Sequence, residues 1–576
     1  NYQPISLYST RDLINRYTVF NTDSTLTRNV PMGDILDLGV NQITAHSFRG
    51  QVDYNKDWQD NRHALTAVGG MEIRDSKVDS RTDKYYGYND RTLNYANVNG
   101  SSSFRTFPTG QTARIPMNNT FAYSVDRYVS WYGNGAYTYL GRYTLSASGR
   151  IDQSNLFGVD RKDRNVPLWS TGAAWTISRE PFFHSSIVNK LKLRATYGFN
   201  GNIDKSLTAY PVASSLLDFF LTGLPTQYIT NPANPLLQWE KVSQLNLGAE
   251  VSLWNSAVSI SAEYFRKGGR DLLGDLFLDP TSGFPTMRAN IATMKGSGID
   301  LELNATAGRT LQWQTRLLVS HATDKITDIA IIPSSNSFDN GTSRFMLADR
   351  RIIPMIGKPV YGIYSFRYAG LDDQGNPQLY GADGKPGAIP DILNSLPVDK
   401  LVYNGPAQPT FFGGWTNTFS WKNFTLSGTI TYKFGHYFRR NSINYGGLNN
   451  ADIRVPGHAD YALRWKQAGD EKFTDVPKYP GMTNTDQYRD QAWLYSDKLV
   501  ENASHIRLRD VNISYDVFSG RKRFFFKSMQ VYIYMENLGL LWKANKAGID
   551  PDYVPLTYSV FLPAPFTVTA GFKVEL

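Results

Sequence analysis

Residues 244–265, QLNLGAEVSLWNSAVSISAEYF, alternate apolar and polar side chains one by one. Leu247 and Val251 share one parity of this stretch, and Asn246 and Glu250 share the other. The alternation breaks at Trp-Asn-Ser and then resumes. Because successive side chains of a strand leave opposite faces of the sheet, the pattern predicts a β-hairpin with one apolar and one polar face.

The same period of two recurs along the chain, so the sequence predicts an all-β protein. Many of the predicted strands reach about ten residues, which is longer than the usual strand of a soluble sandwich. About fifteen of them are expected to be long enough to cross a membrane, namely 41–54, 63–75, 124–139, 142–152, 167–178, 190–200, 241–254, 257–267, 295–306, 311–325, 409–421, 423–436, 505–516, 528–537 and 565–576.

Short and long connections take turns between these strands. The short ones are 55–62, 139–142, 254–256, 306–310 and 421–423, and the long ones are 76–122, 200–240, 268–292, 326–408, 438–504 and 538–564. This asymmetry is typical of a bacterial outer-membrane barrel, which has tight periplasmic turns and extended extracellular loops. We therefore expect a transmembrane antiparallel β-barrel whose apolar face meets lipid.

The domain organisation follows from the same alternation. Residues 37–576 are interpreted as the C-terminal portion of the barrel, and residues 1–36 as an extracellular segment ahead of its first strand. The strand-like segment 359–370 would break the alternation of connections, so it is assigned to a long connection. Bacterial single-chain barrels have even strand numbers. An odd count therefore leads us to expect at least one further strand ahead of Asn1.

Composition removes several classes of protein. No stretch approaches the ~20 apolar residues of a membrane helix, which excludes a helical membrane protein. The chain has no cysteine, which excludes disulfides and thiol chemistry. The net charge of +9 comes from dispersed basic residues, so a solvated surface is favoured over a nucleic-acid partner, and outer-membrane lipid and lipopolysaccharide stay open as partners.

The sequence contains no recognisable catalytic or metal-binding pattern. The seven histidines are scattered without metal-ligand spacing, and no nucleophile elbow or phosphate-binding glycine loop occurs. The run 372–376, DDQGN, resembles part of a calcium loop, but it lacks the spaced ligands, so a β-turn is favoured. We expect neither an enzyme nor a cofactor.

Aromatic residues in the long connections are the candidate substrate-binding residues, because such rings stack on sugars or line a peptide site. The alternative interpretation is that these residues pack within the loops or contact a partner. This alternative is favoured, and ligand binding stays open beside it. Near strand ends, Trp254, Trp421 and Tyr432 are interpreted as interfacial girdle residues. The candidates for substrate binding are Phe219, Phe220, Tyr228, Tyr445, Trp465 and Trp493.

Several blocks, in a constant order from near residue 120 onward, resemble the SusC/RagA family of TonB-dependent outer-membrane transporters. Any single block would be a weak signal, but the ordered set is specific. The blocks are 141–158 (GRYTLSASGRIDQSNLFG), 169–183 (WSTGAAWTISREPFF), 191–202 (LKLRATYGFNGN), 231–254 (NPANPLLQWEKVSQLNLGAEVSLW), 295–303 (KGSGIDLEL), 503–517 (ASHIRLRDVNISYDV) and 535–552 (MENLGLLWKANKAGIDPD).

The resemblance implies a 22-stranded barrel filled by an N-terminal plug. It implies import of a bulky glycan or peptide, energised by the TonB–ExbB–ExbD system, with a SusD-like surface lipoprotein as a lid. Two features depart from the family pattern: the sequence shows no plug or TonB box, and Leu576 stands where an aromatic residue is usual. A passive porin or a structural barrel is the alternative.

Overall fold

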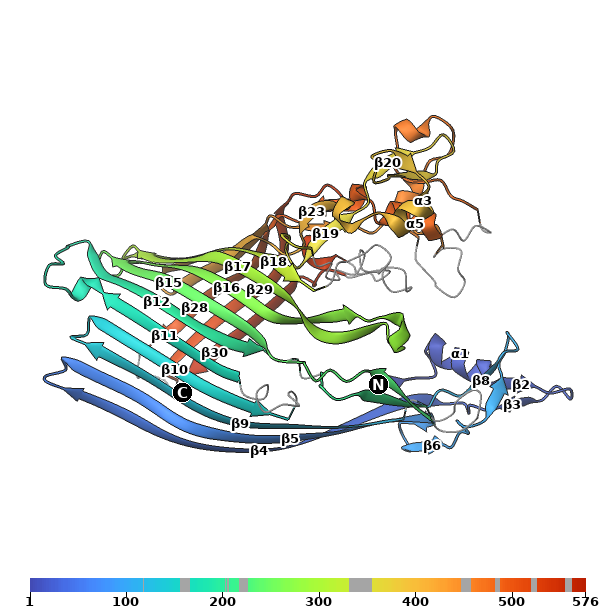
Figure 1. Cartoon of the computed structure of the whole chain (residues 1–576), viewed down its shortest axis with the longest axis horizontal. Coiled ribbons are helices and arrows are strands. Elements are labelled where there is room, and N and C mark those ends of the chain that lie inside the picture. The colour runs from blue at the N-terminus through green and yellow to red at the C-terminus, as the bar shows by residue number, and fades with distance from the viewer. Residues whose placement is uncertain are drawn as a thin grey trace. The chain divides into compact units, whose positions relative to one another are not determined.

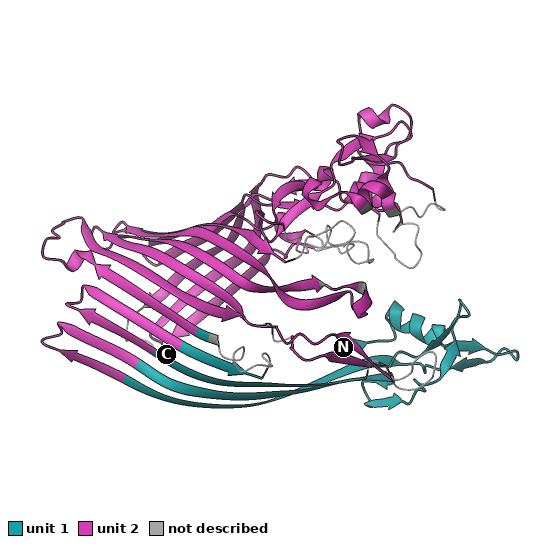
Figure 2. Cartoon of the chain, in the orientation of Figure 1, with its two compact units in different colours: residues 1–53, 68–133, 150–167 teal, residues 54–67, 134–149, 168–576 magenta. Residues whose placement is uncertain are grey.

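The computed structural model describes residues 1–117, 119–155, 166–202, 204, 207–216, 226–330, 355–446, 457–481, 487–519, 526–554 and 562–575. The chain forms two compact units (Figure 2). Unit 1 contains residues 1–53, 68–133 and 150–167, and unit 2 contains residues 54–67, 134–149 and 168–576. No helix in the described ranges is long and apolar enough to cross a membrane.

A 17-stranded antiparallel sheet dominates the structure (Figure 1). Two of its strands are short, β1 (Tyr2–Gln3) and β6 (Asn94–Ala96). The other fifteen are β4 (Asp34–Trp58), β5 (His63–Asn89), β9 (Thr120–Tyr139), β10 (Tyr143–Ser154), β11 (Val166–Thr176), β12 (Val188–Asn202), β15 (Glu240–Leu253), β16 (Val258–Phe277), β17 (Thr286–Ala307), β18 (Leu311–Ile329), β24 (Phe411–Trp421), β25 (Phe424–Phe434), β28 (His505–Ser519), β29 (Ser528–Lys543) and β30 (Thr567–Glu575). Each predicted spanning strand is found, so the all-β prediction is confirmed.

Several strands run further than the alternation predicted. β5 continues to Asn89, so the segment 76–122 begins within a strand, and β16 and β17 leave only residues 278–285 of the segment 268–292 outside strands. The reason is that backbone pairing continues past the apolar zone, where both faces meet water and an alternating sequence is no longer required. Alternation therefore marks the apolar part of a strand rather than its end.

The segments outside the sheet in unit 1 share a small core with residues of β4 and β5. They include α1 (Tyr8–Arg16), β2 (Thr18–Phe20), β3 (Leu26–Arg28), β7 (Ser103–Arg105) and β8 (Thr112–Arg114). The core residues are Ile14, Tyr17, Val30, Ile35, Tyr86 and Ile115. In unit 2, β13 (Val212–Leu216) pairs with β14 (Thr226–Asn231) as a separate two-stranded ribbon.

Strand register gathers the apolar side chains on one face of the sheet. Val251 pairs with Leu191 on β12 and with Ile260 on β16. Directly paired residues share a face, so a continuous row forms across eight strands. Its members, in order, are Leu191, Val251, Ile260, Leu303, Leu317, Trp415, Ile430 and Leu508. We call this side the apolar face.

The opposite side of the same strands carries charged and amide side chains. On β15 the neighbour of Val251 is Glu250, which accepts from the Lys190 ammonium at 2.8 Å. Arg316 and Glu302 form a second cross-strand ion pair at 3.0 Å. A shift of the strand register by one residue would move every apolar side chain to the opposite face of the sheet. The need to keep the apolar side chains on one face therefore fixes the register. We call this side the polar face.

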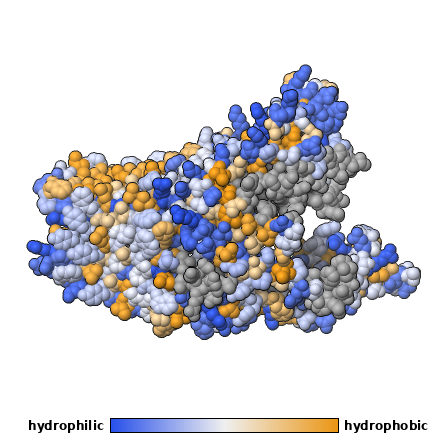
Figure 3. Space-filling view, in the orientation of Figure 1, coloured by the Kyte–Doolittle hydropathy of each residue, from blue (hydrophilic) through white to orange (hydrophobic). Residues whose placement is uncertain are grey.

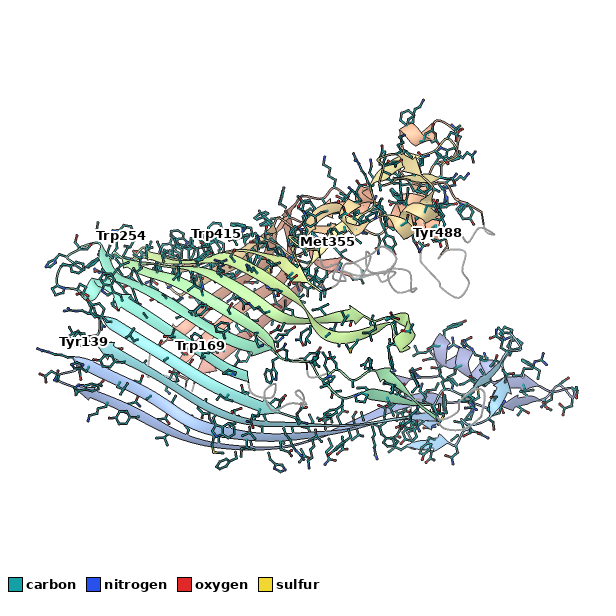
Figure 4. The ribbon with its side chains drawn as sticks, in the orientation of Figure 1. Tyr139, Trp169, Trp254, Met355, Trp415 and Tyr488 are labelled. Carbon is teal, nitrogen blue, oxygen red and sulfur yellow. The ribbon has the colours of Figure 1, made fainter. Side chains whose placement is uncertain are left out.

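Two tryptophan indoles on the apolar face are hydrogen-bonded within the sheet. The indole N–H of Trp415, labelled in Figure 4, donates to Thr315 Oγ1 at 2.9 Å, and that of Trp313 donates to Asn417 Oδ1 at 3.0 Å. A polar group left unpaired in hydrocarbon is costly. These bonds leave the two large rings free to face lipid, as tryptophans of a membrane barrel do.

Aromatic rings on the sheet cover glycines on the neighbouring strand. Tyr432 lies across Gly413, its directly paired residue, and its hydroxyl donates to the Leu318 carbonyl at 2.7 Å. A Cβ on Gly413 would lie 2.0 Å from the Leu318 oxygen and 2.5 Å from the Tyr432 hydroxyl. Phe265 and Gly298 are paired in the same way. A glycine under an aromatic ring is a known device for fixing register.

We expect Gly413→Ala to lower the free energy of unfolding by roughly 1–3 kcal/mol, because the new methyl group overlaps a backbone oxygen. Gly428→Ala is the matched control on the adjacent strand, since its Cβ would have its nearest neighbour at 3.6 Å. The measurement is the urea-unfolding midpoint of the detergent-solubilised protein. Equal midpoints for the two variants would contradict the close packing of Tyr432 on Gly413.

Candidate functional site: a folded loop module

Two connections that are far apart in the sequence fold together into one module of unit 2. The first follows β18 and comprises residues 355–410, and the second follows β25 and comprises residues 435–504 without 447–456 and 482–486, which lie outside the described residues. We call these residues the loop module. Its elements are β19 (Gly362–Ser365), β20 (Tyr368–Leu371), β21 (Pro377–Tyr380), β22 (Pro386–Gly387), α3 (Ile389–Ser395), η5 (Val398–Lys400), β23 (Val402–Pro406), β26 (Tyr437–Arg439), η6 (Ala459–Leu463), η7 (Asp470–Lys472), α5 (Gln487–Leu494), η8 (Asp497–Leu499) and β27 (Val500–Asn502).

The strands of the module pair with each other rather than with the large sheet. β19 pairs with β23, β21 pairs with both β20 and β22, and β26 pairs with β27. The segment 359–370 therefore belongs to a long connection, as the alternation of connections indicated, and its two strands are too short to cross a membrane.

A single hydrophobic core joins the two connections. The first contributes residues such as Phe366 and Ile392, and the second contributes residues such as Trp493 and Leu499. The described part of the module that faces the viewer in Figure 3 is mainly hydrophilic. The full core is Phe366, Tyr368, Leu371, Leu379, Ile392, Leu396, Ile443, Tyr445, Val476, Ala492, Trp493, Tyr495 and Leu499. Segments 326–408 and 438–504, predicted as two loops, are thus parts of one folded body over their described residues.

Backbone hydrogen bonds also tie the two connections together. The Phe366 N–H donates to the Tyr495 carbonyl at 3.0 Å, and the Asp497 N–H donates back to the Phe366 carbonyl at 3.0 Å. The Tyr368 hydroxyl donates to the Asp475 carbonyl at 2.8 Å. Burial raises the pKa of Tyr368 above its ordinary value. This hydroxyl therefore stays protonated and keeps its donor role.

Arg439 is the electrostatic centre of the module. Its guanidinium donates to the carbonyls of Tyr364 at 2.6 Å and Ser496 at 3.0 Å and to Ser365 Oγ at 2.9 Å. Burial lowers the pKa of Arg439 to about 10, so the group is charged at neutral pH. Its acceptors come from both connections, and a charged donor strengthens each bond.

The structure favours packing for two of the candidate binding residues. Tyr445 is 1% exposed and Trp493 is 2% exposed, and both lie in the module core. The Tyr445 hydroxyl donates to the Pro477 carbonyl at 2.7 Å, and the Trp493 indole donates to Ser442 Oγ at 2.8 Å. Protein atoms cover these rings and satisfy their polar groups, so neither ring offers a free face to a ligand.

Two of the other four candidates, Trp465 and Tyr228, lie in the described residues. Trp465 is half-buried against the module core, and its indole donates to Glu471 Oε2 at 3.1 Å. Tyr228 is 50% exposed on the ribbon of β13 and β14. Phe219 and Phe220 lie outside the described residues. The structure therefore brings Tyr445, Trp465 and Trp493 together as packing residues, and Tyr228 is the described candidate with an accessible ring.

The run 372–376 is the turn of the β20–β21 hairpin. The Gly375 N–H donates to the Asp372 carbonyl at 3.0 Å, and Asp372 Oδ1 accepts from the N–H groups of Gln374 and Asn376. Gly375 has φ +75°, which favours glycine. Over the ranges that the structure describes, no group of three potential metal ligands was found. The β-turn prediction is confirmed.

A charged cluster lies where the second connection meets β25 and β28. Asp552, in η9 (Pro551–Tyr553), accepts from Lys433 Nζ at 2.7 Å and from Arg507 Nε at 3.1 Å, and His505 Nε2 lies 3.3 Å away. Arg507 also contacts Asp550 at 2.5 Å. The cluster joins the 544–566 connection to two strand ends. The sequence analysis missed it because its members come from separate segments, with Lys433 and Asp552 119 residues apart.

The ionisation of Asp552 is set by these neighbours. Burial alone would raise the pKa of its carboxyl group, but the bonds and charges of His505 and Lys433 outweigh burial. The net effect holds the pKa of Asp552 well below its ordinary value of 3.8. Asp552 is therefore a permanent anion at neutral pH, and it balances the cations around it.

Comparison with known proteins was made for the whole chain. The family model described as "TonB dependent receptor-like, beta-barrel" matches residues 1–538. TonB-dependent receptor P26 of Formosa agariphila is 27% identical over 516 residues, which cover 85% of this chain and 48% of that relative. TonB-dependent receptor SusC of Bacteroides thetaiotaomicron is 22% identical over 458 residues, which cover 74% of this chain and 41% of SusC.

The fold matches a solved structure. The structure of the RagAB peptide transporter superposes with a TM-score of 0.74 at 21% identity, covering 94% of this chain and 56% of that one. At this level of identity the match supports the fold alone. The chain spans about half the length of the curated relatives it matches.

We expect Trp493→Ala to destabilise the loop module by roughly 3–5 kcal/mol, because it removes a fully buried ring. The matched control is Phe473→Ala, since Phe473 lies in the same connection and is 90% exposed. The measurement is protease resistance or hydrogen exchange of residues 355–410 in the membrane-embedded protein. A module that stays protected in Trp493→Ala would contradict the packing role.

We expect Asp552→Asn to lower the free energy of unfolding at pH 7 by roughly 2–3 kcal/mol, somewhat less than the ~3–5 kcal/mol of a fully buried pair. The pKa of Asp552 is lower in the folded state than in the unfolded state, so its contribution is complete above about pH 5 and is lost as the pH falls. The difference between wild type and variant, measured as urea midpoints, should shrink from about pH 5 to about pH 2. A difference that does not change with pH would contradict the role of the charge.

Proposed function

Because the chain belongs to the TonB-dependent receptor β-barrel family, with the match covering residues 1–538, we propose that the protein imports a bulky substrate across the bacterial outer membrane with energy delivered through TonB. The family match is the observation that carries this proposal. It also favours energised import over the alternative of a passive porin or a structural barrel. The proposal includes a plug domain, through which the TonB–ExbB–ExbD system would deliver its energy.

The sheet supports a transport role in physical terms. One face carries apolar rows and bonded tryptophans suited to lipid, and the other carries ion pairs such as Arg316–Glu302. A polar face turned inward suits a water-filled or plugged lumen. The matching family is one of TonB-dependent receptors, so the proposal is for a transporter rather than an enzyme.

We propose a SusD-like surface lipoprotein as the partner, seated on the loop module. The module supports this assignment because it has its own core and is therefore a preorganised surface. Phe473 and Leu463 project from it with exposed fractions of 90% and 63%. Burial of these side chains against a partner would be favourable, because it removes apolar surface from water. SusC is one of the curated relatives, which adds to the support.

The substrate class we propose is an oligosaccharide or a peptide. The solved structure with the same fold is that of a peptide transporter. Tyr228, with its exposed ring, is the described aromatic residue best placed to contact such a ligand, and Phe219 and Phe220 are proposed with it. Tyr445, Trp465 and Trp493 support the site by keeping the module folded.

Uptake of labelled peptides and oligosaccharides by cells that carry the whole transporter tests the function. We expect uptake of one of the two classes to fall to background when TonB is deleted or when the inner-membrane proton gradient is collapsed. A passive porin would continue to admit the label under both treatments. Uptake that does not depend on TonB would therefore overturn the proposal.

The partner is tested by replacing both connections of the module, 355–410 and 435–504, with short linkers. Both must be removed, because either alone would leave half of the shared core exposed. We expect the barrel to reach the membrane in normal amounts while co-purification of the lipoprotein is lost. Intact co-purification would place the seat elsewhere.

A further inference from the structure

Three cations stand together on the apolar face of β16, β17 and β18. Lys295 on β17 is directly paired with Lys325 on β18. Arg266 on β16 is paired with Ser297, which is the next residue of β17 on that face. Directly paired Cα atoms are about 4.5–5.5 Å apart, and residues two apart along a strand about 7 Å. The three charged groups can therefore reach a common point.

These side chains are exposed and lack a protein counter-ion. Within the described ranges, Arg266, Lys295 and Lys325 form no side-chain hydrogen bond and no ion pair with another residue. The nearby Lys241 differs, because it is bound to Asp271 at 3.0 Å. Like charges directly opposite each other destabilise a sheet. A pair such as Lys295 and Lys325 therefore calls for an anion from outside the chain.

The position of the cluster identifies the anion. The outward residues of β16 are apolar or aromatic from Val258 to Tyr264, and Arg266 is the next one. Val258 to Arg266 is about the length of strand that crosses the hydrocarbon core, which takes ~9–11 residues. The cations lie toward the end of the strands opposite the tight turns at 254–257 and 308–310, and tight turns face the periplasm. They are thus level with the head groups of the outer leaflet.

We propose that Arg266, Lys295 and Lys325 bind the phosphate groups of a lipopolysaccharide molecule in the outer leaflet. The lipid A part of this glycolipid carries its phosphates at the boundary between sugar and acyl chains. The same molecule can then place its acyl chains along the apolar rows below, beside Tyr264 and Ile299. Basic residues at a membrane boundary bind anionic head groups in this way.

The test compares two triple variants of the whole transporter in detergent or lipid nanodiscs. One replaces the cluster, Arg266→Gln, Lys295→Gln and Lys325→Gln. The control removes three cations from the polar face of the same sheet, Lys192→Gln, Lys267→Gln and Lys573→Gln, which lie opposite Glu250, Gln244 and Gln530. The probe is purified lipid A with both phosphates, and native mass spectrometry measures the bound lipid.

We expect the cluster variant to bind bisphosphorylated lipid A roughly a hundredfold more weakly, because each cation near an anionic lipid surface contributes about fivefold to binding. The control should stay within about twofold of wild type. Equal binding by the cluster variant and wild type, or an equal loss in the control, would overturn the proposal.

Two further arms use the wild-type protein and do not depend on assembly of the variants. Dephosphorylated lipid A should bind much more weakly than the bisphosphorylated form, and equal binding would overturn a phosphate site. Millimolar inorganic phosphate should fail to displace bound lipid A. Displacement at such concentrations would overturn the assignment to a lipid, because it would show that a free phosphate ion is sufficient.

Discussion

Backbone hydrogen bonding between strands is the constraint on which the rest of this structure depends. A strand that crosses hydrocarbon must bond every N–H and C=O to a neighbouring strand, because no water is available there. Pairing fixes register, and register fixes which side chains share a face. The row from Leu191 to Leu508 is the direct result, since apolar residues on eight strands come into line. The packing of the Tyr432 ring on Gly413 also holds this register locally.

The loop module is stabilised in a different way from the sheet, because it lies in water and must bury its own hydrophobic core. Its two connections leave the sheet at different strands, and each contributes part of one shared core. Arg439 donates to carbonyls of both, and the shared core includes residues from both. The Asp552 cluster then ties a third connection to the ends of β25 and β28. A partner would thus meet a preformed surface rather than separate flexible loops.

The strands could be predicted from the sequence because each one carries its own local signal. Alternation over about ten residues needs no information from the rest of the chain, so strands such as β15 and β16 are found where they were expected. The pairing of loops has no such signal. The sequence cannot show that Phe366 and Trp493 share a core, because contacts between residues so far apart depend on the folded sheet that brings the loops together.

The same reasoning explains which site residues were predictable. Aromatic residues in the long connections were predicted as candidates for ligand binding, with packing within the loops as the alternative. Tyr445 and Trp493 are buried, which agrees with packing. The basic cluster escaped notice because Arg266, Lys295 and Lys325 are dispersed in the sequence and meet only through strand pairing. Once the register is known, the period of two places all three on the outward face.

The central claim is that the apolar face of β15 meets lipid and its polar face does not. This chain contains no cysteine, so single cysteines can be placed in it at each position from 245 to 253 and spin-labelled in the membrane-embedded protein, once any cysteine outside this chain has been replaced. The account predicts that accessibility to oxygen peaks at odd positions such as 247 and 251, and that accessibility to a water-soluble nickel chelate peaks at even ones such as 246 and 250. Accessibility without a period of two, or with the two probes reversed, would contradict it.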